Sequence, residues 1–171
     1  MDWFSEQFDK VGRDFNRLFT SAEKTNCVRT GIVSLREGGH TKIPQYVFDN
    51  APKIRVVDGT KNSLQELSDK FHAFKVLQKL LLPQNALRSI PASICLPTIT
   101  ILALDQNQIT HLPESVGNLT KLKKLTLASN PLAELPASIG ELKALETLDL
   151  SNCRLGSSAS RDSAGLAGLG R

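Results

Sequence analysis

The chain has 171 residues, of which 40% are hydrophobic and 22% charged, and this composition predicts one globular unit with short tails. Its net charge of +4 is spread along the sequence without a basic run, so we expect no nucleic-acid partner. The three cysteines, Cys27, Cys95 and Cys153, are far apart. This spacing is typical of a reducing compartment and predicts buried small side chains rather than metal ligands or a catalytic thiol.

Residues 1–19 predict an amphipathic helix, because seven apolar side chains recur at spacings of three and four: Trp3, Phe4, Phe8, Val11, Phe15, Leu18 and Phe19. The segment lacks a signal-peptide pattern, and no apolar run is long enough to cross a bilayer, so we expect a cytoplasmic protein. Three roles stay open for this helix: a cap over the core that follows, a docking helix for a partner, or a weak contact with a membrane surface. Its nearly neutral polar face counts against the membrane role.

Residues 20–67 hold two imperfect copies of a pattern that becomes regular from Leu77 onward. In the second copy, IRVVDGTKNSLQEL, Gly59 takes the place of a core leucine, which leaves room there or admits a neighbouring side chain. In the first copy, TGIVSLREGGHTKIP, Gly38 stands in the place of an Asn and His40 in the place of a leucine. Atypical first coils are common in repeat arrays, because they pack on a cap.

Four regular copies start at Leu77, Ile99, Leu122 and Leu145, and they read LQKLLLPQNAL, ITILALDQNQI, LKKLTLASNPL and LETLDLSNCRL. Their near-constant spacing and their L-x-x-L-x-L-x-x-N/C-x-L pattern identify the leucine-rich repeat. Residues 20–155 are therefore predicted to form an α/β leucine-rich-repeat solenoid that follows the amphipathic helix. We expect a right-handed arc of about six short coils with a parallel sheet on its concave side.

Each part of a copy has a predicted place in the coil. Alternating leucines such as Leu125 and Leu127 enter the core from a short strand. The ninth residue is expected to bond the turn that follows, and neighbouring coils share these bonds as a ladder of Asn62, Asn85, Asn107, Asn130 and Cys153. A proline then suits the start of a short helical or 3₁₀ segment. The inner side of these segments is predicted to be Ile94, Val116 and Ile139.

The block AEKTNCVRTGIVSLREGGHTKIP, followed by LPxxI-type repeats, resembles the intracellular family of leucine-rich-repeat-containing protein fifty-seven. This resemblance covers about residues 20–155 and implies repeats of the Ras-like, LP-containing class. Members of that family are similar to N-myristoylated proteins with Gly directly after the initiator Met. Asp2 occupies this place here, so the resemblance does not extend to lipidation.

Residues 156–171, GSSASRDSAGLAGLGR, are rich in Gly, Ser and Ala and predict a disordered tail. No further LPxxI half-coil precedes this tail, so we expect a shortened array whose last leucines lack a cover. Self-association through this uncapped C-terminal edge is a corresponding prediction.

The sequence holds no motif that carries catalytic chemistry. Gly-rich phosphate loops, paired His or Cys ligands and a nucleophile elbow are all missing, and the three His are isolated. We therefore predict no enzymatic activity, no cofactor and no metal ion.

The concave face is the predicted binding site, because outward residues of successive strands stack there into columns. Its candidate residues are Ile32, Val56, Lys79, Leu81, Ile101, Ala103, Asp105, Lys124 and Thr126. The apolar members form a patch toward the N-terminal half, and contiguous apolar surface marks interaction sites. The alternative is that the N-terminal helix or a neighbouring loop covers part of this patch.

Two functions follow from these features. The first is a cytoplasmic adaptor or scaffold that binds a protein partner on the concave face, in signalling of the small-GTPase or phosphatase kind to which Ras-type repeats are often linked. The second is a peripheral membrane protein that the aromatic helix directs to the surface, with the repeats as a rigid carrier.

Overall fold

The computed structural model describes residues 29–156. The helix predicted over residues 1–19 and most of the predicted tail lie outside these residues, as does Cys27.

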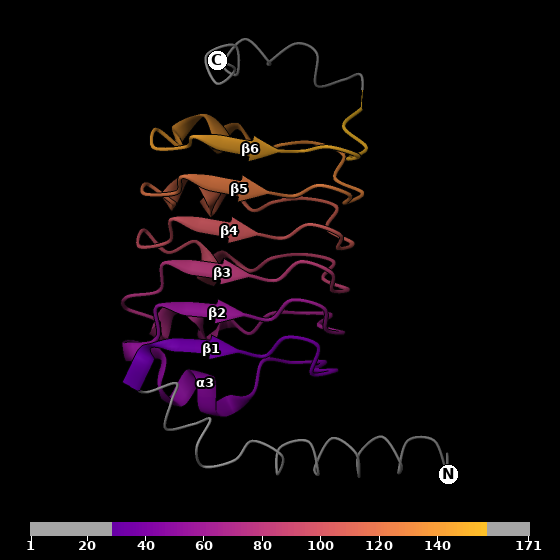
Figure 1. Ribbon diagram of the computed structural model, residues 1–171. Coiled ribbons are helices and arrows are strands. Elements are labelled where there is room, and N and C mark those ends of the chain that lie inside the picture. Colours follow the sequence, from indigo (N-terminus) through magenta and orange to yellow (C-terminus); the bar gives the residue numbers. More distant parts are fainter. Residues whose placement is uncertain (1–28, 157–171) are drawn as a thin grey trace, which may run out of the picture.

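Six short strands, one from each coil, form a single parallel sheet in chain order (Figure 1). Their bounds are β1 Ile32–Ser34, β2 Val56–Asp58, β3 Lys79–Leu81, β4 Ile101–Ala103, β5 Lys124–Thr126 and β6 Thr147–Asp149. Each strand pairs in register with the next, so that Leu80, Leu102 and Leu125 are neighbours across β3, β4 and β5. The predicted leucine-rich-repeat solenoid with its parallel sheet is thus confirmed.

Short helical segments return the chain on the opposite side of each coil. Their bounds are α3 Gln45–Asp49, η1 Ala51–Lys53, η2 Asp69–Ala73, η3 Ala92–Ile94, η4 Glu114–Asn118 and η5 Ala137–Glu141, where η marks a 3₁₀ helix. Pro91, Pro113 and Pro136 directly precede the last three, in extended backbone conformation. This position suits proline, because its missing N–H would have no partner inside the helix.

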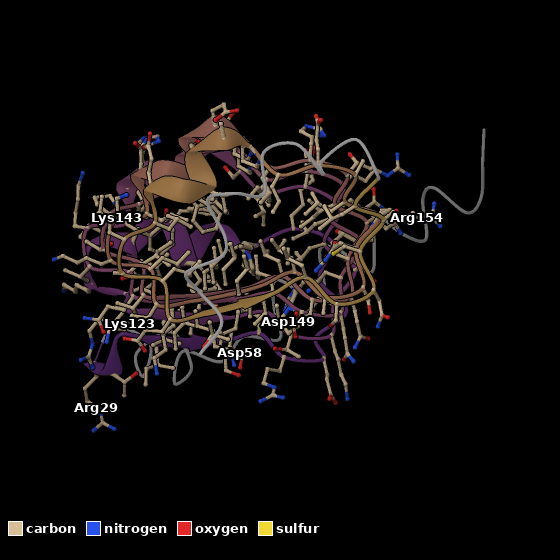
Figure 2. The ribbon with its side chains drawn as sticks, turned by 90° about the horizontal axis from the view of Figure 1, so that it is seen from above. Arg29, Asp58, Lys123, Lys143, Asp149 and Arg154 are labelled. Carbon is tan, nitrogen blue, oxygen red and sulfur yellow. The ribbon has the colours of Figure 1, made fainter. Side chains whose placement is uncertain are left out.

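The core fills the space between the sheet and the helical segments (Figure 2). Leu80, Leu102 and Leu125 are completely buried in it. Ile94, Val116 and Ile139 close it from the helical side, as predicted. A parallel stack of this kind buries every inner coil against two neighbours, and hydrophobic burial is therefore the main source of its stability.

Gly59 and His40 show how the two imperfect coils are accommodated. A Cβ atom at Gly59 would lie 2.9 Å from Leu82 Cδ2 and 3.6 Å from Leu64 Cδ1, so neighbouring side chains occupy the space of the missing leucine. The ring of His40 folds over Gly38, where a Cβ atom would lie 2.5 Å from His40 Nε2. Partial burial lowers the pKa of His40 from its ordinary value.

Three phenylalanines form an aromatic cluster that the repeat pattern does not predict. Phe48 from α3 meets Phe71 of η2 edge to face, with ring centroids 5.6 Å apart, and Phe71 stacks on Phe74 at 5.2 Å. All three are buried. The cluster joins the first coils on their helical side, where the later coils use the smaller Ile94, Val116 and Ile139.

The eighth residue of every coil adopts a left-handed backbone conformation, which sequence reasoning also missed. The φ angles lie between 53° and 58° at Glu37, Lys61, Gln84, Gln106, Ser129 and Asn152. Left-handed residues are usually Gly, Asn or Asp, and only Asn152 is of these types. The composition of the turns therefore gave no signal for this geometry.

We expect the substitution Gly117→Ala to destabilise the fold by about 1–3 kcal/mol, because the added methyl group overpacks the contact between η4 and η5. A Cβ atom at Gly117 would lie 3.0 Å from Ser138 Cβ and 2.7 Å from Glu141 Oε2. Urea denaturation of both proteins measures the difference.

Gly140 is the matched control, since it holds the same place in the next coil and a Cβ atom there would meet nothing within 4 Å. Gly140→Ala should be neutral or stabilise by up to about 1 kcal/mol. Equal effects at the two glycines would contradict the packing described for η4 and η5.

Candidate functional site

The side chains that point away from the core form one continuous surface, the outer sheet face, which is the face predicted to be concave. Its first column is Ile32, Val56, Lys79, Ile101, Lys124 and Thr147, and its second is Ser34, Asp58, Leu81, Ala103, Thr126 and Asp149. A third column lies two residues further along each coil. It contains Asp105, which is bonded to Thr126 of the second column and to Ala128 of the third. The structure thus brings all nine candidate residues onto this face.

The apolar residues of the outer sheet face differ in exposure. Ile32 is 49% exposed, whereas Val56, Leu81, Ile101 and Ala103 are half-buried. Side chains packed side by side in neighbouring columns shield each other in this way and still present their tips to solvent. The patch runs over β1 to β4, and the register places the exposed Lys79 within it, between Val56 and Ile101.

Three aspartates of the outer sheet face are already engaged by neighbouring groups. Asp58 accepts from the Thr60 N–H at 3.1 Å, and Arg36 lies 3.7 Å away. Asp105 accepts from the Thr126 hydroxyl and from the Ala128 N–H at 3.0 Å. Figure 2 shows Asp58 and Asp149, from near the two ends of the stack, on the side of the sheet away from the helical segments.

Asp149 belongs to the same network on the last described coil. Its carboxylate accepts from the Ser151 N–H at 3.0 Å. This hydrogen bond lowers the pKa of Asp149, and the charge of Lys124 lowers it further. All three aspartates are therefore held within the face and oriented by its own donors.

The two lysines of the first column differ from the other cations near the sheet. Lys79 and Lys124 are exposed, and within residues 29–156 neither forms an ion pair or a side-chain hydrogen bond. By contrast, Lys61 pairs with Glu37 at 3.0 Å and Lys123 with Glu146 at 2.8 Å. The register places Lys79 and Lys124 on either side of Ile101.

A ladder of buried amides supports this face from the turn that follows each strand. The amide of Asn107 donates to the carbonyls of Leu82 at 3.0 Å and Leu104 at 2.9 Å. Its oxygen accepts from the Leu87 N–H at 3.0 Å. Asn62, Asn85 and Asn130 repeat the same bonds to their own and to the preceding coil.

The ladder changes chemistry at the two ends of the described array. In the last coil Cys153 donates from its thiol to the Leu127 carbonyl at 3.3 Å. In the first coil Gly38 stands in the place of the Asn and has no side chain. In this ladder the first coil is therefore bonded only by Asn62 of the second coil, whose oxygen accepts from the His40 N–H and whose amide donates to the Leu35 carbonyl. Cys95 lies elsewhere, after η3, where burial raises the pKa of its thiol.

The last coil is less covered than the inner ones. Leu148 and Leu150 are half-buried and Leu155 is 38% exposed, whereas Leu125, Leu127 and Leu132 in the preceding coil are completely buried. The edge strand β6 pairs with β5, and no other strand of residues 29–156 pairs with it.

A cavity of about 430 Å³ lies beside the first two coils, away from the candidate residues. Its lining is mixed, with apolar residues such as Phe48 and with Lys42 and Glu66, which pair at 2.9 Å. Residues 29–156 contain no group of three His, Cys, Asp or Glu side chains arranged to hold a metal ion. None of the helices in that part of the chain is both long and apolar enough to span a membrane.

Comparison with known proteins supports the assignment of the repeats. The leucine rich repeat family matches residues 97–155. The chain is 36% identical over 103 residues to the plant intracellular Ras-group-related LRR protein 8 of Oryza sativa subsp. japonica. That alignment covers 58% of this chain and 27% of the rice protein, so the chain spans about a quarter of this relative.

Solved structures show the same architecture. An LRR protein of Leptospira interrogans has a TM-score of 0.67 at 24% identity, covers 77% of this chain and is itself covered over 40% of its length. The Arabidopsis thaliana receptor kinase HAESA, solved with the peptide hormone IDA and the co-receptor SERK1, has a TM-score of 0.58 at 32% identity, with 67% of this chain and 20% of HAESA covered. Together with the six coils and their ladder, these likenesses show that residues 29–156 fold as a leucine-rich-repeat solenoid.

Proposed function

We propose that this protein is a binding module that recognises a protein partner on the outer sheet face. The observation that carries the proposal is an apolar patch on a rigid parallel sheet, in which Ile32 is exposed and Val56, Leu81, Ile101 and Ala103 are half-buried. Contiguous apolar surface on a folded domain marks interaction sites, because its desolvation favours association. HAESA, whose repeats are similar, was solved with a peptide hormone and a co-receptor, which supports a partner of this class.

The rigidity of the face favours this role. The strands contain only three residues each, and the ladder fixes the turn after each strand to the next coil. A preorganised surface loses little conformational entropy on binding, so more of the contact energy appears as affinity.

The double substitution Leu81→Glu and Ile101→Glu should abolish partner capture and leave the fold intact. Both side chains reach solvent in the free protein, but a partner would have to desolvate the new carboxylates. Quantitative pull-down from cell extract should show proteins that the native chain retains and the double variant loses by roughly tenfold or more. Circular dichroism and thermal unfolding verify that both proteins are folded.

Val76→Glu combined with Leu155→Glu is the matched control. These residues are 40% and 38% exposed, are also apolar, and lie outside the columns of the outer sheet face. Capture should survive in this control. Unchanged capture by a folded Leu81→Glu and Ile101→Glu variant would instead exclude the outer sheet face as the site.

The cellular setting that we propose is a cytoplasmic adaptor or scaffold in signalling. The support is the similarity to the rice relative, which is named as an intracellular Ras-group-related protein. Self-association through the less covered last coil is a further proposal, and sedimentation of the full chain would detect it. Membrane attachment through residues 1–19 stays the alternative function, and co-sedimentation with liposomes before and after Phe4→Glu plus Phe8→Glu separates it from the adaptor.

A further inference from the structure

We infer that the outer sheet face binds an extended protein segment whose acidic side chain sits between Lys79 and Lys124, above Ile101. This inference rests on the proposed function and adds the chemistry of the partner. Its basis is the arrangement of charge on the face, where acidic groups are internally bonded and two cations are not.

The positions of the two lysines follow from the strand register. Lys79, Ile101 and Lys124 are direct neighbours on β3, β4 and β5. Adjacent strands lie about 4.8 Å apart, so the two lysine Cα atoms are separated by roughly 10 Å. Lysine has a flexible four-carbon stem, and both ammonium groups can therefore converge on one carboxylate held above Ile101.

The acidic residues of the face form no ion pair with either lysine among residues 29–156, because other groups of the face hold their carboxylates. Asp58 and Asp105 accept hydrogen bonds from Thr60 and from Ala128, on strands or turns of the face itself. Asp149 is bonded by Ser151, and although its pKa responds to Lys124, the two do not form an ion pair. The three carboxylates are thus fixed in place by the face itself, and Lys79 and Lys124 are the cations of its first two columns, without an ion pair among residues 29–156, that can meet a carboxylate from a partner.

The surroundings of the two lysines select the rest of the partner. Leu81 and Ala103 lie beside Lys79 and Ile101 in the next column and are half-buried. An apolar floor excludes water around a bound carboxylate and strengthens its attraction to the ammonium groups. The matching segment therefore carries Asp or Glu flanked by aliphatic or aromatic residues.

In the experiment, a library of displayed random peptides of twelve residues is selected for binding to the full 171-residue chain. The affinities of selected sequences are then measured with synthetic peptides. Selected peptides should share an Asp or Glu between apolar residues. Lys79→Gln combined with Lys124→Gln should weaken their binding roughly ten- to hundredfold. Replacing the acidic residue of the peptide by its amide should weaken binding to the native chain similarly and have little further effect on the lysine variant.

Lys121→Gln combined with Lys143→Gln is the matched control, because it removes the same charge from residues that follow η4 and η5. This control should bind the peptides like the native chain. One outcome would overturn the inference and keep the proposed function: the selected peptides lose binding to the Leu81→Glu and Ile101→Glu variant, but they lack an acidic residue or bind the Lys79→Gln and Lys124→Gln variant as tightly as the native chain. Selection of no peptide, or of peptides insensitive to Leu81→Glu and Ile101→Glu, would overturn both.

Discussion

Replacing Leu102 by Ala is expected to lower the free energy of unfolding by about 2–5 kcal/mol, the largest effect among the substitutions considered. Leu102 is completely buried in β4, between Leu80 of the preceding coil and Leu125 of the next. Truncation removes buried methyl groups and leaves a cavity, because neighbouring coils held by strand pairing cannot collapse into it. Urea denaturation followed by circular dichroism gives the value.

Two comparisons test the reason for this loss. Ile101→Ala changes the adjacent residue of the same strand, but its side chain faces out and is half-buried, so the loss should stay below about 1 kcal/mol. Leu148→Ala truncates the equivalent core position of the last coil, which is also half-buried. Its cost should fall between the other two, and equal costs at Leu102 and Leu148 would mean that both coils are equally covered.

The second large effect is expected at Asn107, where substitution by Ala should cost about 1–3 kcal/mol. The ladder shows which group is responsible. The Leu82 and Leu104 carbonyls keep the amides of Asn85 and Asn130 as donors after the substitution. The Leu87 N–H has Asn107 Oδ1 as its acceptor and would be left unpaired in the core.

Gln108→Ala is the control, because Gln108 is exposed and follows Asn107 directly in the chain. It should change stability by less than about 0.5 kcal/mol. Chemical denaturation gives the free energy of unfolding of the Asn107→Ala and Gln108→Ala variants for this comparison. Hydrogen exchange adds a local readout, since the Leu87 amide should lose protection in Asn107→Ala while the Leu125 amide keeps it. Unchanged exchange at Leu87 would show that water replaces the lost acceptor.

The repeat pattern was sufficient to predict the architecture and the register of the sheet. Leucines at fixed spacing can be buried together in one way, so the outward residues between them, such as Lys79, Ile101 and Lys124, were expected in stacked columns, and the strand register shows them there. The imperfect coils also followed, because counting back from Leu77 put Gly59 and His40 at core positions. At Gly59 two outcomes were open, and the neighbouring Leu82 and Leu64 decided between them.

Features that depend on contacts between coils were not predictable in this way. The cluster of Phe48, Phe71 and Phe74 joins residues that share no repeat position, so periodicity gives no signal for it. The left-handed turns use residues such as Gln84 and Gln106, whose types do not favour that conformation. On the outer sheet face the columns followed from the repeat spacing, whereas the hydrogen bonds of Asp58, Asp105 and Asp149 to nearby donors depend on turn geometry that the spacing does not determine.

The fixed rise of the coils makes the outer sheet face a measuring scale for whatever binds along it. Coils repeat about every 4.8 Å, whereas an extended chain advances about 3.3 Å per residue. Residues of a bound extended segment therefore coincide with successive coils only at intervals. Two coils span roughly the length of three extended residues, which is the separation between Lys79 and Lys124. Because alternate side chains of an extended chain point to opposite sides, a straight bound segment would present the same side in step with the coils again only after about six residues and four coils. A one-residue insertion in that segment would turn all later side chains to the opposite side.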